Sequence, residues 1–121
     1  MMRGHVLVVD DSPTGRHAAS LLLERSGYQV STAVDGEDAL EKIAAALPPV
    51  VVLDIVLPKM NGYQVLRQLK SSETTRGIKV ILVSSKSQES DRFWGLKQGA
   101  DEYIAKPYQD SALLAAVARQ L

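Results

Sequence analysis

Residues 49–54 read PVVVLD, a short apolar run that ends at a carboxylate. Four apolar residues in succession indicate a strand buried on both faces, because a half-exposed strand would alternate apolar and polar positions. Three other runs end in the same way: 5–9 before Asp10 and Asp11, 79–83 before Ser84 and Ser85, and 103–105 before Lys106. In an open α/β sheet the carboxyl ends of parallel strands share one edge, where ligands bind. We therefore expect these polar side chains to meet there.

Segments of helical length separate the runs, and a more polar run at 28–34 predicts an additional, edge strand. The first helix is predicted to begin at Ser12-Pro13 and to stop at Gly27. The others are predicted at 36–47, at 62–71, from a Ser87 cap to Gly99, and from Gln109 or Asp110 to the end of the chain. Their inward faces are expected to include Ala18, Leu47 and one of the two aromatic residues Phe93 and Trp94. This alternation predicts an α/β fold with five parallel strands and five helices.

Composition narrows the possible functions. The 121 residues suit one domain, expected to span 1–121 and to leave no room for an output domain. Lys+Arg and Asp+Glu are both 14, so neither nucleic acid nor an anionic membrane is an expected partner. With no cysteine, disulfides and thiolate zinc sites are excluded. Neither a signal peptide nor a membrane span is predicted, which favours the cytoplasm.

Asp10, Asp11 and Asp54 are the candidate metal ligands. Like charges about 4 Å apart repel by roughly 4 kcal/mol at an effective dielectric of 20, so such a cluster raises a pKa or binds a cation. Carboxylate oxygens without nearby His or Cys favour Mg²⁺. Alternatively, Asp10 and Asp11 only complement a helix dipole, and Asp54 is a third ligand without a covalent role. If Asp54 does have a covalent role, it is the candidate nucleophile toward phosphorus.

Lys106 and Ser84 are the candidate partners of a phosphoryl group. The Lys106 ammonium could pair with a phosphoryl oxygen, and the Ser84 hydroxyl could donate a hydrogen bond to another. On position alone, Lys106 could equally be a surface lysine. Ser85 and Ser87 could serve only to cap the next helix. His5 and His17 lack metal-ligand spacing and are interpreted as structural or surface residues.

Together, Asp10-Asp11, Asp54, Ser84 and Lys106-Pro107 resemble the CheY-like receiver domains of two-component response regulators. The resemblance covers essentially the whole chain, including Pro58-x-x-Asn61-Gly62 and Gly99-Ala100-Asp101-x-Tyr103. It implies a flavodoxin-like doubly wound sheet with the strand order 2-1-3-4-5. A stand-alone, phosphorylation-controlled signalling switch is therefore expected, and not an enzyme, although it would catalyse its own phosphorylation and slow dephosphorylation.

The resemblance also implies a role for each site residue. Asp54 would accept a phosphoryl group from a sensor histidine kinase or phosphotransfer domain. Asp11, Asp54 and the Val56 backbone carbonyl would ligate Mg²⁺, with Asp10 acting mainly through ordered water. Lys106 would contact the phosphoryl oxygens, and the Lys106–Pro107 bond would be cis. Ser84 and Tyr103 would be the switch residues, and Val56 and Lys86 would tune the lifetime of the phosphoryl group.

The resemblance also implies a partner and a pathway. Residues 85–100 look like the stand-alone receivers of type IV pilus (twitching motility) and chemotaxis-like systems. A downstream protein target would bind the face formed by the fourth helix, the fifth strand and the last helix. The chain could instead be a phosphate sink for a shared kinase. Less favoured are an aspartate-nucleophile phosphohydrolase, which usually needs a second Asp where Val56 stands, and a flavin binder, whose phosphate Asp10-Asp11 would repel.

Overall fold

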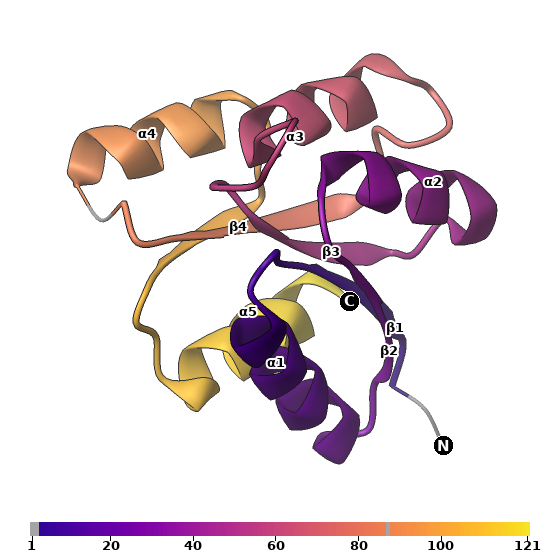
Figure 1. The fold of residues 1–121 in the computed structure, drawn as a ribbon, viewed down its shortest axis with the longest axis vertical. Helices are drawn as coiled ribbons and strands as arrows, with labels where there is room; N and C mark the ends of the chain where they lie inside the picture. Colours follow the sequence, from indigo (N-terminus) through magenta and orange to yellow (C-terminus); the bar gives the residue numbers. More distant parts are fainter. Residues whose placement is uncertain (1–2, 87) are drawn as a thin grey trace.

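The computed structural model describes residues 3–86 and 88–121, in which strands and helices alternate from end to end (Figure 1). The strands are β1 (His5–Val9), β2 (Gln29–Ala33), β3 (Val50–Asp54), β4 (Lys79–Ser84) and β5 (Glu102–Ala105). The helices are α1 (Pro13–Arg25), α2 (Gly36–Ala46), α3 (Gly62–Ser71), α4 (Glu89–Lys97) and α5 (Asp110–Gln120). Within the described ranges, each helix is too short or too polar to cross a bilayer.

All neighbouring strands are parallel, and their order is β2-β1-β3-β4-β5. The predicted fold class and strand order are therefore confirmed, and the polar run at 28–34 is indeed an edge strand. Every residue of β3 is buried, as its unbroken apolar run indicates, because helices cover both faces of the sheet. The register pairs Val9 with Leu53 and Asp54 with Val83, which brings the strand ends to one edge.

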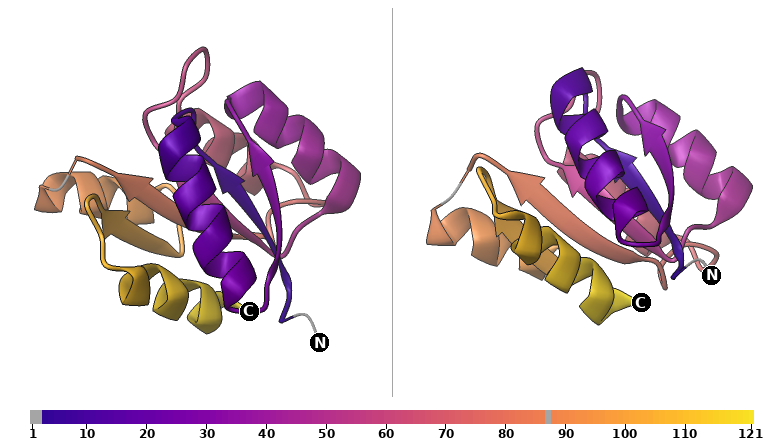
Figure 2. Two further views of the ribbon diagram at one scale, coloured as in Figure 1. Left: turned by 60° about the horizontal axis from the view of Figure 1, so that its bottom comes forward. Right: turned by 90° about the horizontal axis from the view of Figure 1, so that it is seen from below.

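Two hydrophobic cores lie on opposite faces of the sheet. One contains Ala39 and Ile43 from α2 with Val65, Leu66 and Leu69 from α3. The other contains Ala19 and Leu23 from α1 with Leu113, Ala116 and Val117 from α5. Figure 2 shows α1 and α5 on the same side of the sheet. Because strand residues alternate in direction, successive apolar residues of one strand supply both cores.

Several helix ends follow local sequence signals. Ser12 caps α1 by accepting a hydrogen bond from the Gly15 amide, and Pro13 is the first helical residue. Asn61 and Gln64 form a reciprocal capping box at the start of α3. Gln109, one of the two candidates, is the N-cap residue of α5. The N-cap position of α4 is Gln88, and the predicted cap Ser87 lies outside the described residues.

Three expectations about helix faces are wrong. Ala18 is exposed, and its neighbour Ala19 faces the core instead. Leu47 is also exposed, because it ends α2 in a left-handed conformation with φ of 47°. Neither aromatic residue of α4 is buried: Phe93 is 65% exposed and Trp94 47%. The inward residue of α4 is a glycine, so the helix lies too close to the sheet for a large side chain.

Candidate functional site at the carboxyl edge of the sheet

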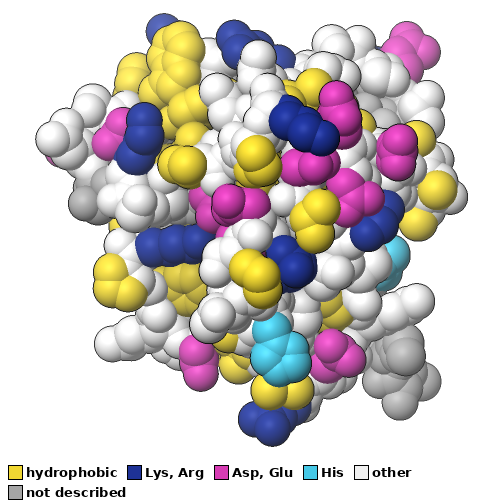
Figure 3. All heavy atoms as spheres, in the orientation of Figure 1, with side chains coloured by type: hydrophobic (Ala, Val, Ile, Leu, Met, Phe, Trp, Pro, Cys, Tyr) yellow, Lys and Arg dark blue, Asp and Glu magenta, His cyan; other side chains and the backbone are white. Residues whose placement is uncertain are grey.

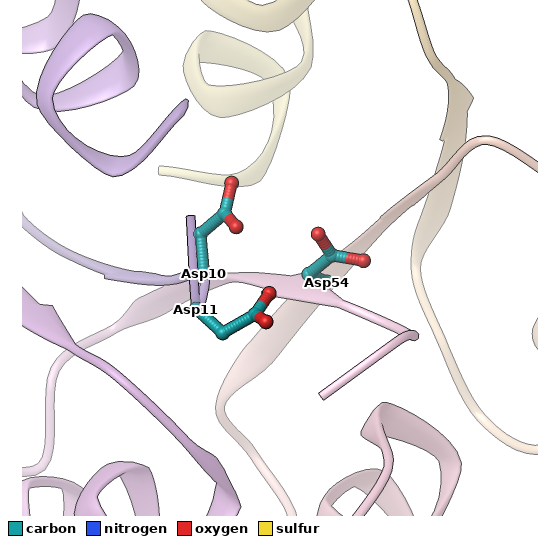
Figure 4. A group of neighbouring side chains, drawn as sticks. All are labelled: Asp10, Asp11 and Asp54. Atoms are coloured by element: carbon teal, nitrogen blue, oxygen red, sulfur yellow. The ribbon is translucent and has the colours of Figure 1, made fainter. Parts of the chain in front are cut away.

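Three carboxylates gather where β1 and β3 end (Figure 4). Asp10 and Asp11 follow β1, and Asp54 is the last residue of the adjacent β3. One oxygen from each of the three lies within 4.8 Å of the others. Asp10 and Asp54 are buried, whereas Asp11 is exposed. Convergence of the two strand ends, predicted from the apolar runs, is therefore confirmed.

Lys106 pairs with two of these carboxylates. Its Nζ lies 2.8 Å from Oδ2 of Asp54 and 3.3 Å from Oδ2 of Asp10. Partial burial lowers the pKa of Lys106, but the hydrogen bond and charge of Asp54, together with Asp10, raise it overall above its ordinary value. The ammonium group therefore stays charged beside the acidic cluster and offsets part of the repulsion within it.

The backbone after each strand also binds its carboxylate. The amide of Ser12 donates to Oδ1 of Asp10 at 2.9 Å, and the amide of Val56 donates to Oδ1 of Asp54 at 3.1 Å. Arg16, which the sequence reasoning did not single out, donates from Nη1 to the Asp10 carbonyl at 2.8 Å. Its position one turn into α1 carries no distinctive signal, since arginines are common on helix surfaces.

Close packing of α3 fixes the backbone around Asp54. A Cβ on Gly62 would lie 2.5 Å from the Asp54 carbonyl oxygen and 2.8 Å from Cα of Ile55. The Gly62 amide also donates to the Ile55 carbonyl at 2.8 Å. Between these points, Lys59 adopts a left-handed conformation with φ of 66°. The loop that carries Val56 is thus held at both ends, and Val56 itself is exposed beside the carboxylates.

Ser84 on β4 and Tyr103 on β5 lie on the side of β3 that faces away from β1. Ser84 is fully buried, and its Oγ accepts a hydrogen bond of 3.1 Å from the Lys86 amide. The Tyr103 ring is buried, and its hydroxyl donates to the Lys86 carbonyl at 2.6 Å. Ser85, the competing hydroxyl, is exposed. Both predicted switch residues therefore contact the backbone of the same residue.

A groove of about 440 Å³ adjoins the site. Its walls are α1 and the connection from β5 to α5, where the Lys106–Pro107 peptide bond is cis, as the resemblance implied. Most of the lining is apolar, and it includes the exposed Ala18. Asp10 and Lys106 also line the groove, so it is continuous with the acidic cluster.

The residues present suit a hard divalent cation. The cluster offers carboxylate oxygens only, with no sulfur and no imidazole among its members. Mg²⁺ prefers such oxygens, usually keeps several waters and takes one or two carboxylates. Three acidic groups within 4.8 Å, only partly offset by Lys106, fit that cation by charge and donor type.

Comparison with known proteins agrees with the fold and the acidic edge. The family model described as the response regulator receiver domain matches residues 6–118. Protein PilH of Pseudomonas aeruginosa is 43% identical over 109 residues, which cover 90% of this chain and 90% of that protein. Protein PilG of the same organism is 40% identical over 112 residues, covering 93% of this chain and 83% of PilG. The crystallised chemotaxis response regulator CheY4 of Vibrio cholerae superposes with a TM-score of 0.92 at 29% identity, over the whole of both chains.

A parallel sheet in this order, with three carboxylates and a lysine at its carboxyl edge, defines a receiver-type signalling domain. The chain belongs to the response regulator receiver family. It is thus a phosphorylation switch of two-component signalling, a signalling protein and not a metabolic enzyme. The resemblance stated from the sequence is confirmed, and its relatives PilH and PilG agree with the group predicted from residues 85–100.

Proposed function

We propose that Asp54 accepts the phosphoryl group and that its ion pair with Lys106 prepares the site for it. The observation that carries this proposal is the position of Lys106 Nζ, 2.8 Å from the Asp54 carboxylate. A cation at that distance from the nucleophile lies where charge on an incoming phosphoryl group has to be offset. Asp10 and Asp54 both pair with Lys106, but of these two carboxylates only Asp54 lies on the central strand β3.

In the transfer, an Asp54 carboxylate oxygen forms a bond to phosphorus as the bond between phosphorus and the donor's imidazole nitrogen breaks. The imidazole leaves with the electron pair of that bond, and the product is an aspartyl phosphate. Such a transfer depends on positioning and charge neutralisation more than on covalent help from the protein. Lys106 supplies positive charge, and the Val56 amide orients Asp54.

Asp11, Asp54 and the Val56 carbonyl would hold Mg²⁺, with Asp10 acting mainly through ordered water. When bound, the cation supplies charge neutralisation for the carboxylates and the phosphoryl group. The donor set described above supports this assignment. Ser84 then moves to donate a hydrogen bond from its hydroxyl to a phosphoryl oxygen, and this movement alters the contact in which its Oγ now accepts from the Lys86 amide.

The new contacts of Ser84 and Lys106 favour the conformation in which both reach the phosphoryl group. Tyr103 shares the Lys86 backbone with Ser84, so a change there is transmitted to β5. The proposed output is an altered surface formed by α4, β5 and α5. Figure 3 shows exposed hydrophobic side chains over α4, and Phe93 and Trp94 belong to that helix.

The proposed donor is a sensor histidine kinase or a phosphotransfer domain in the cytoplasm. A histidine kinase partner is what membership of the receiver family implies. Similarity to PilH and PilG supports a place in the chemotaxis-like pathway of twitching motility. The phosphohydrolase alternative is not supported, because Val56 has no acid or base at the position where such an enzyme needs one.

The test uses Trp94, the single tryptophan of the chain and a residue of the proposed output face. Adding Mg²⁺ with beryllofluoride is expected to change its fluorescence, and acetyl phosphate is expected to label the protein. Asp54→Asn should abolish both responses, whereas Glu73→Gln, an exposed acid between α3 and β4, should leave both intact. Equal labelling of the wild type and Asp54→Asn would show that Asp54 is not the acceptor.

A further inference from the structure

Gly15 lies in the first turn of α1, directly against the Asp10 carboxylate. A Cβ added there would lie 2.6 Å from Asp10 Oδ2 and 3.5 Å from Asp10 Cγ. Real Cβ atoms essentially never lie so close to another heavy atom, so any side chain at this position would displace the carboxylate. Since the backbone of Gly15 is helical, this glycine is not needed for a left-handed turn.

Glycine within a helix is costly, because it loses more backbone freedom on folding than alanine does. The free-energy cost of a glycine in α1 therefore needs a compensating advantage, and room for the neighbouring Asp10 carboxylate is such an advantage. Asp10 Oδ2 is the atom that lies 3.3 Å from Lys106 Nζ. The space left by the missing side chain is occupied by the carboxylate that shares Lys106 with Asp54.

We propose that Gly15 is a positioning residue, which keeps the Asp10 carboxylate beside Lys106 by leaving room for it. Asp10 is held from two sides, by the Ser12 amide on Oδ1 and by Lys106 on Oδ2. A methyl group at position 15 would force Oδ2 out of its present position, and we expect its 3.3 Å contact with Lys106 to be lost. Lys106 would then pair with Asp54 alone, and Asp10 would leave its place beside the cation site. This inference rests on the proposed roles of the acidic cluster.

Gly15→Ala has two opposing effects on stability, since alanine favours the helix whereas loss of the Asp10–Lys106 contact does not, so the melting temperature only verifies that the variant is folded. The site chemistry carries the test. The Mg²⁺ dissociation constant, measured by isothermal titration calorimetry, should rise about 10-fold, the lower end of the range for residues that support metal ligands, because Asp10 is displaced and not removed. The rate of labelling by acetyl phosphate should fall with it. Thr14→Ala, an exposed neighbour in the same helical turn, is the matched control and should keep the affinity within about twofold.

A double-mutant cycle tests whether Gly15 acts through Asp10. On the Asp10→Ala background no carboxylate remains to be displaced, so Gly15→Ala should change Mg²⁺ affinity no further. An equal loss on both backgrounds would overturn the inference, as would wild-type affinity in Gly15→Ala. A crystal structure of Gly15→Ala with Asp10 still against Lys106 would overturn it whatever the metal does. If the wild type binds Mg²⁺ but takes no phosphoryl group, the proposed function fails, and the cycle still decides the role of Gly15.

Discussion

The hydroxyl of Tyr103 donates a hydrogen bond of 2.6 Å to the backbone carbonyl of Lys86. This bond joins β5 to the connection between β4 and α4, across 17 positions of the chain. On its other face the Tyr103 ring lies against α4, where a Cβ on Gly95 would be 2.9 Å from Cδ2 of the ring. The side chain is thus enclosed by the loop that follows Ser84 and by the helix of the proposed output face.

Tyr103→Phe keeps the buried ring and removes this hydrogen bond, leaving the Lys86 carbonyl without its donor. We expect a loss of about 0.5–1.5 kcal/mol in the free energy of unfolding, the usual net value of one such bond. Urea unfolding followed by circular dichroism measures it. Tyr63→Phe is the control, because no hydrogen bond of the Tyr63 hydroxyl occurs within residues 3–86 and 88–121. An equal loss in both variants would assign the effect to the general removal of a hydroxyl.

Gly62→Ala should destabilise the protein strongly, since the new Cβ would lie 2.5 Å from the Asp54 carbonyl oxygen. That neighbour is backbone and cannot rotate away, so we expect a cost of roughly 1–3 kcal/mol, typical of overpacking. Gly77→Ala is the matched control, because a Cβ there meets nothing within 4 Å. Thermal unfolding of the two variants compares them directly. Similar melting temperatures would show that α3 can move away from β3 at little cost.

Val56→Asn should shorten the lifetime of the aspartyl phosphate. Val56 is exposed beside Asp54 and has no polar group that could orient an attacking water, whereas an asparagine side chain has. The decay of the labelled protein after removal of acetyl phosphate measures the lifetime. Val34→Asn, an exposed valine after β2, serves as the control and should leave the decay unchanged. A Val56→Asn decay equal to or slower than that of the wild type contradicts this account.

Stability in acid should depend on Glu102. Its hydrogen bond with Arg119 lowers the pKa of Glu102 below the ordinary value, although partial burial opposes this. Because the folded-state pKa lies below the unfolded one, the ionised carboxylate stabilises the fold above the unfolded pKa. That contribution is lost as the pH falls through the folded pKa. The difference in free energy of unfolding between the wild type and Glu102→Gln should therefore decrease as the pH falls below about 4.5.

Urea unfolding at a series of pH values measures this gap. Glu73→Gln, an exposed acid between α3 and β4, should follow the wild type at every pH. A gap between Glu102→Gln and the wild type that stays constant from neutral pH into acid would show that the contact with Arg119 does not shift the titration of Glu102.

The local elements and the acidic cluster were predictable because their signals are contained in short stretches of chain. An unbroken apolar run such as 50–53 favours a strand buried on both faces, and the carboxyl ends of parallel strands share one edge of the sheet. That rule predicts that Asp10, Asp11 and Asp54 lie close together, without knowledge of any interatomic distance. Burial of α4, by contrast, was predicted wrongly. Its apolar residues Phe93 and Trp94 are exposed, and the contact with the sheet is made through Gly95, whose lack of a side chain gave no periodic signal.

The sequence by itself determined the α/β alternation, the two-sided burial of β3 and the set of polar groups at the strand ends, because each depends on residue type and spacing along a few positions. Only the tertiary structure decided which of those groups touch. Lys106 and Asp10 are 96 positions apart, and their contact depends on how closely the chain segments after β1 and β5 approach one another at the edge of the sheet. That approach is set by packing across the whole domain, and the absence of a side chain at Gly15 acquires a meaning only once Asp10 lies beside it.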